Sequence, residues 1–325
     1  MSDRVIIEVG LNENQDRRAN RHVPYSAAEL AADARRCYEA GAAIVHYHGR
    51  GPAGEPALSD PSLNLAAQRR ITEATPLIAY PSYGAEVRVL DYYDIGTPAP
   101  QRYQHVSETV RGGVRVEVAP VDLGVFDSNA RWDTQAGRLA PSTGLLMNTG
   151  SDHRWILDFC RRNGIKPHFN VFDTIHLQNL LNLIHWNWAG SPPLVVKLFL
   201  AGRSATPSTL LFYHQRLREL FAGVELIWMP LVYGTDQFPL CTLALAFGGH
   251  VRIGIGDHHY REHGEPTNAA LVEQMVTVAR AIGREPATPD EARAQMGLAT
   301  RRAAPSTRSA QGPGTPPPGS VPRSY

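Results

Sequence analysis

The sequence predicts a (β/α)8 barrel, the TIM-barrel fold, and two observations lead to this prediction. Short apolar segments of strand character alternate with longer segments of helical apolar spacing, a pattern typical of βαβ units and a parallel sheet. About eight such pairs occupy roughly 280 residues, close to the usual size of this barrel. An open doubly wound sheet is the alternative, but it would place a glycine-rich phosphate loop after the first strand, and residues 10–13 do not form one.

Local patterns define each expected element. Ser26 and Glu29 form a capping box that begins a helix, and Gly41 ends that helix. The expected strands cover residues 5–11, 43–48, 76–81, 114–123, 166–172, 194–200, 224–229 and 250–255. The expected helices cover residues 26–39, 60–74, 152–163, 175–188, 207–221, 237–246, 266–282 and 284–297, with one more near 86–93. Residues 124–143 are expected to be irregular, and residues 144–147 can form a short extra strand.

The composition divides the chain into a barrel domain over residues 1–298 and a tail over residues 299–325. The tail is rich in Pro, Gly, Ser and Arg and has almost no apolar residues. It cannot bury enough surface to offset the entropy lost on ordering, so we expect it to be disordered.

Composition also limits the partners. The formal charge is +1, with 43% hydrophobic and 19% charged residues, so nothing favours binding to nucleic acid or to an anionic membrane. The sequence has neither a membrane-length apolar run nor a basic-then-apolar leader, and we expect a soluble, cytoplasmic protein. Cys37, Cys160 and Cys241 match no zinc or disulfide spacing and are expected to be reduced and near the core.

Two histidines at the end of the second expected strand organise the predicted site. The apolar residues 42–45 precede His46 and His48, and Gly49 and Arg50 follow. Alternate side chains of a strand share a face, so the two imidazoles would lie side by side, as a divalent metal requires of two nitrogen ligands. A pair of solvated loop histidines is the alternative.

Polar residues gather where the other expected strands end, which is where barrel enzymes carry their chemistry. Asp173 could instead be a helix N-cap, and Ser82 a turn residue. The residues at this rim are Asn12, Glu13, His46, His48, Ser82, Asp122, Asp173, Arg252 and Asp257.

Four segments resemble the β-keto acid cleavage enzymes, whose founding activity is cleavage of 3-keto-5-aminohexanoate. The likeness spans roughly residues 4–297. The segments are 24–30 with 39–42, 46–50 (His-Tyr-His-Gly-Arg), 171–173 (Val-Phe-Asp) and 248–254 (Gly-Gly-His-Val-Arg-Ile-Gly).

The resemblance implies a TIM barrel, usually a homotetramer, that binds one divalent metal, normally Zn²⁺. Such enzymes convert a β-keto acid and acetyl-CoA into acetoacetate and an acyl-CoA. By this likeness His46 and His48 are metal ligands, and Ser82 holds the substrate carboxylate. Arg252 and Asp257 form the dyad that activates the acetyl-CoA nucleophile, and Asn12, Glu13 and Asn170 are further candidates for substrate binding. The metal would polarise the ketone, and a carboxylate steered by a guanidinium would act as general base.

The chain departs from the family pattern at two positions. The family usually has a glutamate, its third metal ligand, immediately before the catalytic aspartate, where this chain has Gly256. It often has an acid before Val-Phe-Asp, where this chain has Asn170, which makes a cationic substrate less suited.

We therefore consider Glu8 as the third ligand. Alternation along the first strand puts Ile6, Glu8 and Gly10 on one face; if that face points into the barrel, Glu8 is a buried carboxylate that needs a partner. Pairing of Glu8 with Arg252 is the alternative, and direct ligation by Asp257 or His258 is a third arrangement.

Two other functions compete with an acyltransferase. An amidohydrolase-type metal hydrolase also combines a His-x-His pair with a late aspartate, but its pair follows the first strand. A non-catalytic barrel without metal would explain Gly256 but not the retained polar rim.

Overall fold

The computed structural model describes residues 4–13, 15–55, 57, 60–81, 99–127, 132–133, 138–139 and 145–299. Ser82, the helix expected near residues 86–93 and the tail from residue 300 onward lie outside the described residues. Among the described helices, none has the length and apolarity needed to cross a membrane.

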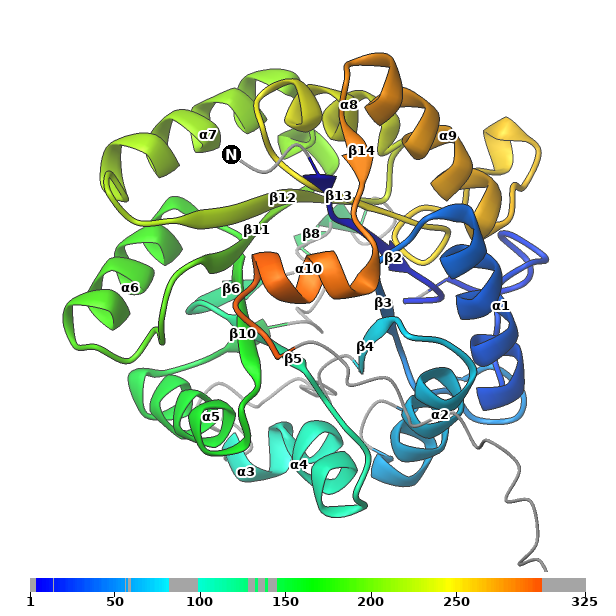
Figure 1. Ribbon diagram of the computed structural model, residues 1–325, viewed down its shortest axis with the longest axis horizontal. Coiled ribbons are helices and arrows are strands. Elements are labelled where there is room, and N and C mark those ends of the chain that lie inside the picture. The colour runs from blue at the N-terminus through cyan, green and yellow to red at the C-terminus, as the bar shows by residue number, and fades with distance from the viewer. Residues whose placement is uncertain are drawn as a thin grey trace, which may run out of the picture.

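Within the described chain, eight parallel strands form a closed barrel, as the sequence predicts (Figure 1). Two four-stranded sheets, in the orders β13-β2-β3-β4 and β12-β11-β10-β5, meet where β4 lies beside β5 and β12 beside β13. The strands are β2 (Ile7–Gly10), β3 (Ile44–Tyr47), β4 (Ile78–Pro81), β5 (Val118–Asp122), β10 (Lys166–Val171), β11 (Leu194–Ala201), β12 (Leu226–Tyr233) and β13 (Val251–Ile253).

Helices surround the barrel and bury their apolar faces against it (Figure 1). The first helix has the predicted capping box of Ser26 and Glu29 and ends at Gly41, which has the left-handed φ of 114°. Asp173 caps a later helix by accepting the N–H of Ile175, which is the alternative named above for this residue. The helices are α1 (Ala27–Ala40), α2 (Pro61–Ala74), α3 (Ala99–Arg102), α4 (Gln104–Arg111), α5 (Gly150–Asn163), α6 (Thr174–His185), α7 (Pro207–Leu220), α8 (Phe238–Ala246) and α9 (Asn268–Ala281).

The sequence analysis did not predict α4. Its buried face includes His105, Ser107 and Thr109 beside Val106, so polar residues interrupt the apolar spacing that marks a helix. The three cysteines are reduced and buried within α1, α5 and α8, as expected.

The chain ends close the N-terminal mouth of the barrel. β1 (Arg4–Val5) pairs with β14 (Glu285–Pro286), and α10 (Pro289–Gln295) lies across the opening (Figure 1). Ala292 and Met296 pack with Ile6 and other apolar side chains inside the barrel. The N-terminal half of the barrel interior is therefore apolar and closed. Within the described residues, a polar site has room at the opposite mouth, where the strands end.

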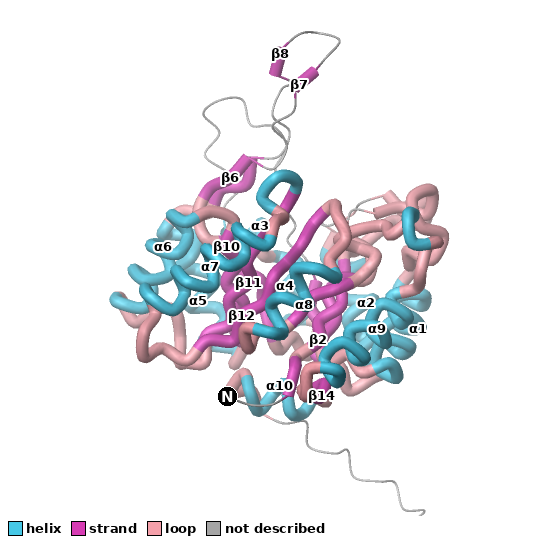
Figure 2. The backbone as a smooth tube through the Cα atoms, turned by 90° about the horizontal axis from the view of Figure 1, so that it is seen from above, coloured by secondary structure: helices cyan, strands magenta, loops and turns pink. Residues whose placement is uncertain are grey.

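Two antiparallel ribbons lie at that opposite end. β6 (Val125–Asp127) pairs with β9 (Leu145–Met147), the short extra strand considered above, and β7 (Trp132–Asp133) pairs with β8 (Arg138–Leu139). Figure 2 shows β7 and β8 standing away from the barrel on the side opposite α10.

The fully buried Arg293 of α10 allows a test of how much the closed N-terminal mouth contributes to the stability of the barrel. Its Nε and Nη2 donate to the two carboxylate oxygens of Glu117, at 2.7 and 2.8 Å. We expect Arg293→Met to lower the free energy of unfolding by about 3 kcal/mol, because it leaves Glu117 buried with less compensation. Urea unfolding measures this, and the Arg293→Met/Glu117→Gln double variant should recover part of the loss. Equal stability of Arg293→Met and wild type would contradict the prediction.

Candidate active site

His46 and His48 point into the barrel from the end of β3. Both side chains are buried, and their rings stand edge to face with centroids 5.4 Å apart. Asn12 holds this strand end in place, because its Oδ1 accepts the N–H of His48 at 2.8 Å and its Nδ2 donates to the carbonyls of His48 and Pro24. All polar side-chain atoms of Asn12 thus contact the backbone.

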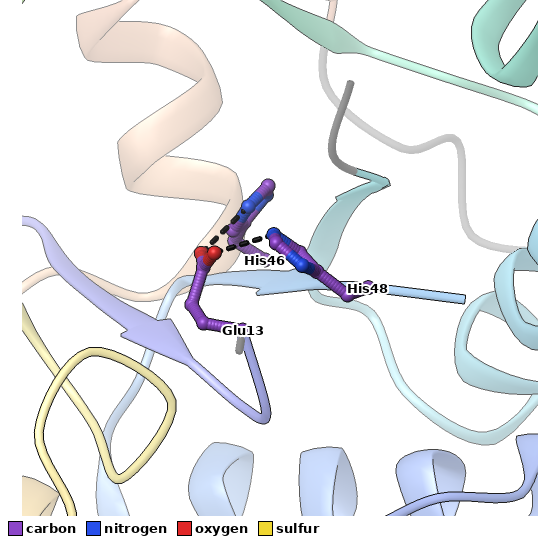
Figure 3. A group of neighbouring side chains, drawn as sticks. All are labelled: Glu13, His46 and His48. Carbon is purple, nitrogen blue, oxygen red and sulfur yellow. Dashed lines mark ion pairs between the residues drawn. The ribbon is translucent and has the colours of Figure 1, made fainter. Parts of the chain in front are cut away.

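Glu13 completes a group of three potential metal ligands with the two histidines (Figure 3). Its carboxylate lies between the imidazoles, with Oε1 2.8 Å from Nε2 of His46 and Oε2 against Nε2 of His48. The three ligand atoms lie within 4.8 Å of one another, and all three residues are buried. Sequence reasoning placed Glu13 at the rim but assigned it to the substrate.

The electrostatics of this group favour metal binding. Burial lowers the pKa of His46 to about 4, so this imidazole is neutral near pH 7, the form that coordinates metals. Burial opposes ionisation of Glu13, but His48, His46 and Arg252 outweigh it and hold the pKa of Glu13 well below its usual range.

Arg50 fixes the loop that carries Glu13. Its Nη2 donates to the carbonyls of Asn12 and Gln15, at 2.9 and 2.6 Å, and its Nη1 donates to Gly54 at 2.7 Å. This buried guanidinium explains why an arginine follows the histidine pair.

Glu8 faces into the barrel but lies outside the group of ligands. Its carboxylate accepts from Nζ of Lys197 at 2.7 Å, from Nη1 of Arg252 at 2.9 Å and from the hydroxyl of Tyr80 at 2.6 Å. The structure therefore does not support Glu8 as the third ligand. It shows the alternative named above, a buried pairing with Arg252, because the two cationic side chains compensate the carboxylate.

Arg252 and Asp257 form a bidentate pair beside the ligand group. Nε and Nη2 of Arg252 donate to the two oxygens of Asp257, at 2.9 and 2.8 Å. Nη2 also contacts Glu13, so one guanidinium connects the expected base with the expected metal site. Burial raises the pKa of Asp257, although Arg252 counteracts this effect.

Sequence reasoning missed two members of this cluster, Tyr80 and Lys197. Both are fully buried in the middle of strands, and burial lowers the pKa of Lys197 to about 8. A lysine within the otherwise apolar strand β11 was the available signal. The cluster thus contains two cations, Lys197 and Arg252, and three carboxylates, those of Glu8, Glu13 and Asp257. A bound positive ion would balance the remaining negative charge.

Asn170 and Asp122 lie on neighbouring strands at the same mouth. Nδ2 of Asn170 donates to Oδ1 of Asp122 at 2.5 Å. Burial raises the pKa of Asp122 to about 7. Oδ1 of Asn170 is buried and has no hydrogen-bond partner within the described residues.

Gly256 explains how Glu13 reaches the histidines. A Cβ at residue 256 would lie 2.7 Å from the carbonyl oxygen of Gly10 and 2.8 Å from the backbone nitrogens of Asn12 and Glu13. The N–H of Gly256 donates to the same carbonyl of Gly10 at 3.0 Å. The missing side chain therefore lets the loop after β13 pack directly on the loop after β2.

Comparison with known proteins identifies the family. The sequence profile of the beta-keto acid cleavage enzymes matches residues 4–298, and the chain belongs to this family. The 3-keto-5-aminohexanoate cleavage enzyme of Acetoanaerobium sticklandii is 30% identical over 294 residues, which cover 86% of this chain and 92% of that protein. The 3,5-dioxohexanoate:acetyl-CoA acetone transferase of Paraburkholderia graminis is 27% identical over 282 residues, covering 85% and 90%.

Solved structures support the fold. ObcA, in its ternary complex with a C4-CoA adduct and oxalate, aligns with a TM-score of 0.63 at 18% identity, over 85% of this chain and 68% of that chain. The type I 3-dehydroquinate dehydratase of Clostridium difficile aligns with a TM-score of 0.54 at 8% identity, over 86% of this chain and 92% of that chain. The matches favour neither the amidohydrolase nor the non-catalytic alternative.

The packing of Gly256 predicts an effect on metal binding. Gly256→Ala should displace the loop that carries Glu13 and lower the affinity of the three-ligand group for a divalent metal by about 10- to 100-fold, as loss of a supporting contact does in known metal sites. Gly150→Ala is the matched control, because a Cβ there meets no atom within 4 Å. Competition with a chelator measures both affinities, and equal values for the two variants would contradict this account of the loop.

Proposed function

We propose that this enzyme condenses a β-keto acid with acetyl-CoA and releases acetoacetate and an acyl-CoA. The observation that carries the proposal is that the group of three potential metal ligands contacts the pair of Arg252 and Asp257 at one mouth of the barrel. Glu13 belongs to the three-ligand group and also contacts Nη2 of Arg252, which together with Nε donates to Asp257. Family membership and the acetyl-CoA in the names of relatives support the same reaction class.

We propose Glu13, His46 and His48 as the residues that hold a divalent metal, with zinc as the ion. Two imidazoles and one carboxylate form a donor set typical of catalytic zinc. Nε2 of His48 fits this assignment, because it faces the Glu13 carboxylate and makes no hydrogen bond with any described residue. When bound, such an ion acts as a Lewis acid toward a carbonyl oxygen.

Asp257 is the proposed general base for the carbon next to a carbonyl. Its burial raises its proton affinity, and the bidentate contact with Arg252 fixes the direction of its oxygens. Nη1 of Arg252 donates to Glu8 and to the hydroxyl of Tyr80, and Lys197 in turn donates to Glu8. These contacts hold the guanidinium so that its Nε and Nη2 meet Asp257. Ser82 remains our proposal for the substrate carboxylate.

The substrate proposal rests on Asn170. This residue carries no charge that could pair with an ammonium group, so we propose a β-keto acid with an uncharged acyl chain. The homotetramer and the cytoplasmic location implied by the sequence analysis also remain predictions.

Metal content and turnover test the proposal together. Wild type should hold one zinc per chain in the group of Glu13, His46 and His48 and form acetoacetate from acetyl-CoA and at least one member of a panel of β-keto acids. His46→Ala/His48→Ala and Glu13→Gln should lose this zinc and the turnover, because each removes ligands from the same group. Elemental analysis and an acetoacetate assay provide the two readouts.

Asp257→Asn is the matched control for these variants. It should keep the metal but lose about 10²- to 10⁴-fold in turnover, because it removes the base and leaves the ligands in place. Full metal content in Glu13→Gln would exclude Glu13 as a ligand. Absence of both metal and turnover in wild type would favour the non-catalytic barrel.

A further inference from the structure

We propose a second divalent-cation site on the loop between β13 and α9, formed by His258, His259 and Glu262. These residues are grouped closely enough to share one ion, with their ligand atoms within 4.8 Å of one another. The loop begins at the end of the barrel strand β13, and the three residues follow Asp257 on it. The proposal does not depend on the reaction proposed above.

The arrangement repeats the chemistry of the inner group. Glu262 lies between two imidazoles, with Oε1 against Nε2 of His258 and Oε2 3.6 Å from Nδ1 of His259. In the inner group, Glu13 lies between His46 and His48 in the same way. Two imidazoles and one carboxylate suit ions such as Zn²⁺, Co²⁺ and Ni²⁺ better than Mg²⁺ or Ca²⁺, which prefer oxygen ligands.

The second site differs from the inner one in its exposure. The side chain of His258 is 7% exposed, whereas those of His259 and Glu262 are 38% and 45% exposed. One anchored ligand and two accessible ones can admit an ion directly from solvent, and water would fill the remaining coordination positions. The site should therefore load and unload more readily than the inner group.

A simple ion pair accounts for only part of this geometry. A contact between His258 and Glu262, four residues apart, explains one carboxylate oxygen. It does not explain why His259 lies at the other oxygen. Nδ1 of His259 also accepts the N–H of Arg261 at 3.1 Å, a bond that a bound ion would replace.

Binding at this site would stiffen the loop that carries Asp257. An ion shared by residues 258, 259 and 262 closes a short ring of backbone directly after the proposed base, and Tyr260 within that ring has a left-handed φ of 53°. The expected role is therefore to hold the start of the loop, and with it Asp257, in one position.

Titration of the metal-free protein with Co²⁺ tests the proposal. Wild type should bind two equivalents per chain by equilibrium dialysis, and His259→Ala and Glu262→Gln should each bind one. His263→Ala is the matched control, because His263 lies on the same loop but faces Asp236, at 3.6 Å, and should keep both equivalents. A single equivalent in wild type that persists in Glu262→Gln, or two equivalents in both His259→Ala and Glu262→Gln, would overturn the proposal.

The inner variants separate the two sites. Glu13→Gln should lose the inner equivalent and retain the one that depends on Glu262. His259 and Glu262 are half-exposed, so their replacement leaves the core intact and a folding defect does not confuse the result. If the equivalent retained in Glu13→Gln also persists in Glu13→Gln/Glu262→Gln, the ion binds elsewhere and the second site is wrong.

Discussion

One buried guanidinium holds the interior of this barrel together. Arg252 donates to Glu8 through Nη1 and to Asp257 through Nε and Nη2, and it contacts Glu13 through Nη2. An arginine can remain charged in this setting because carboxylates surround it, and those carboxylates can ionise because the arginine is present. The three acids come from a strand, from the loop after that strand and from the loop after its neighbour. Their common partner thus determines how these segments sit against one another.

The side chains inside the barrel change from apolar to charged along the barrel axis. Strand alternation directs Ile6, Glu8 and Gly10 inward from one segment, and Ile44, His46 and His48 inward from the next, so each strand leads from apolar to polar. The apolar end packs against α10, and the charged middle pairs within itself. The group of Glu13, His46 and His48 therefore lies above a closed, apolar base, where its charges are poorly screened.

Alternation and strand order explain how much the sequence could predict. They place His46 beside His48 and Arg252 near Asp257, and they put Glu8 inside the barrel with Arg252 as a candidate partner. The position of Glu13 depends on a loop held by Arg50 and on the contact across Gly256, and neither is visible in local spacing. Lys197 and Tyr80 are hidden for another reason, since buried polar residues in mid-strand look like interruptions of a core until their partners are known.

The pairing of the two chain ends has a consequence for how the protein is made. β2 needs β13 as its neighbour, and β1 needs β14, so contacts join residues separated by nearly the whole barrel sequence. Such non-local contacts slow folding, because a long loop must close before they contribute. During synthesis the edge of β1 that pairs with β14 therefore stays unpaired until about residue 286 has left the ribosome.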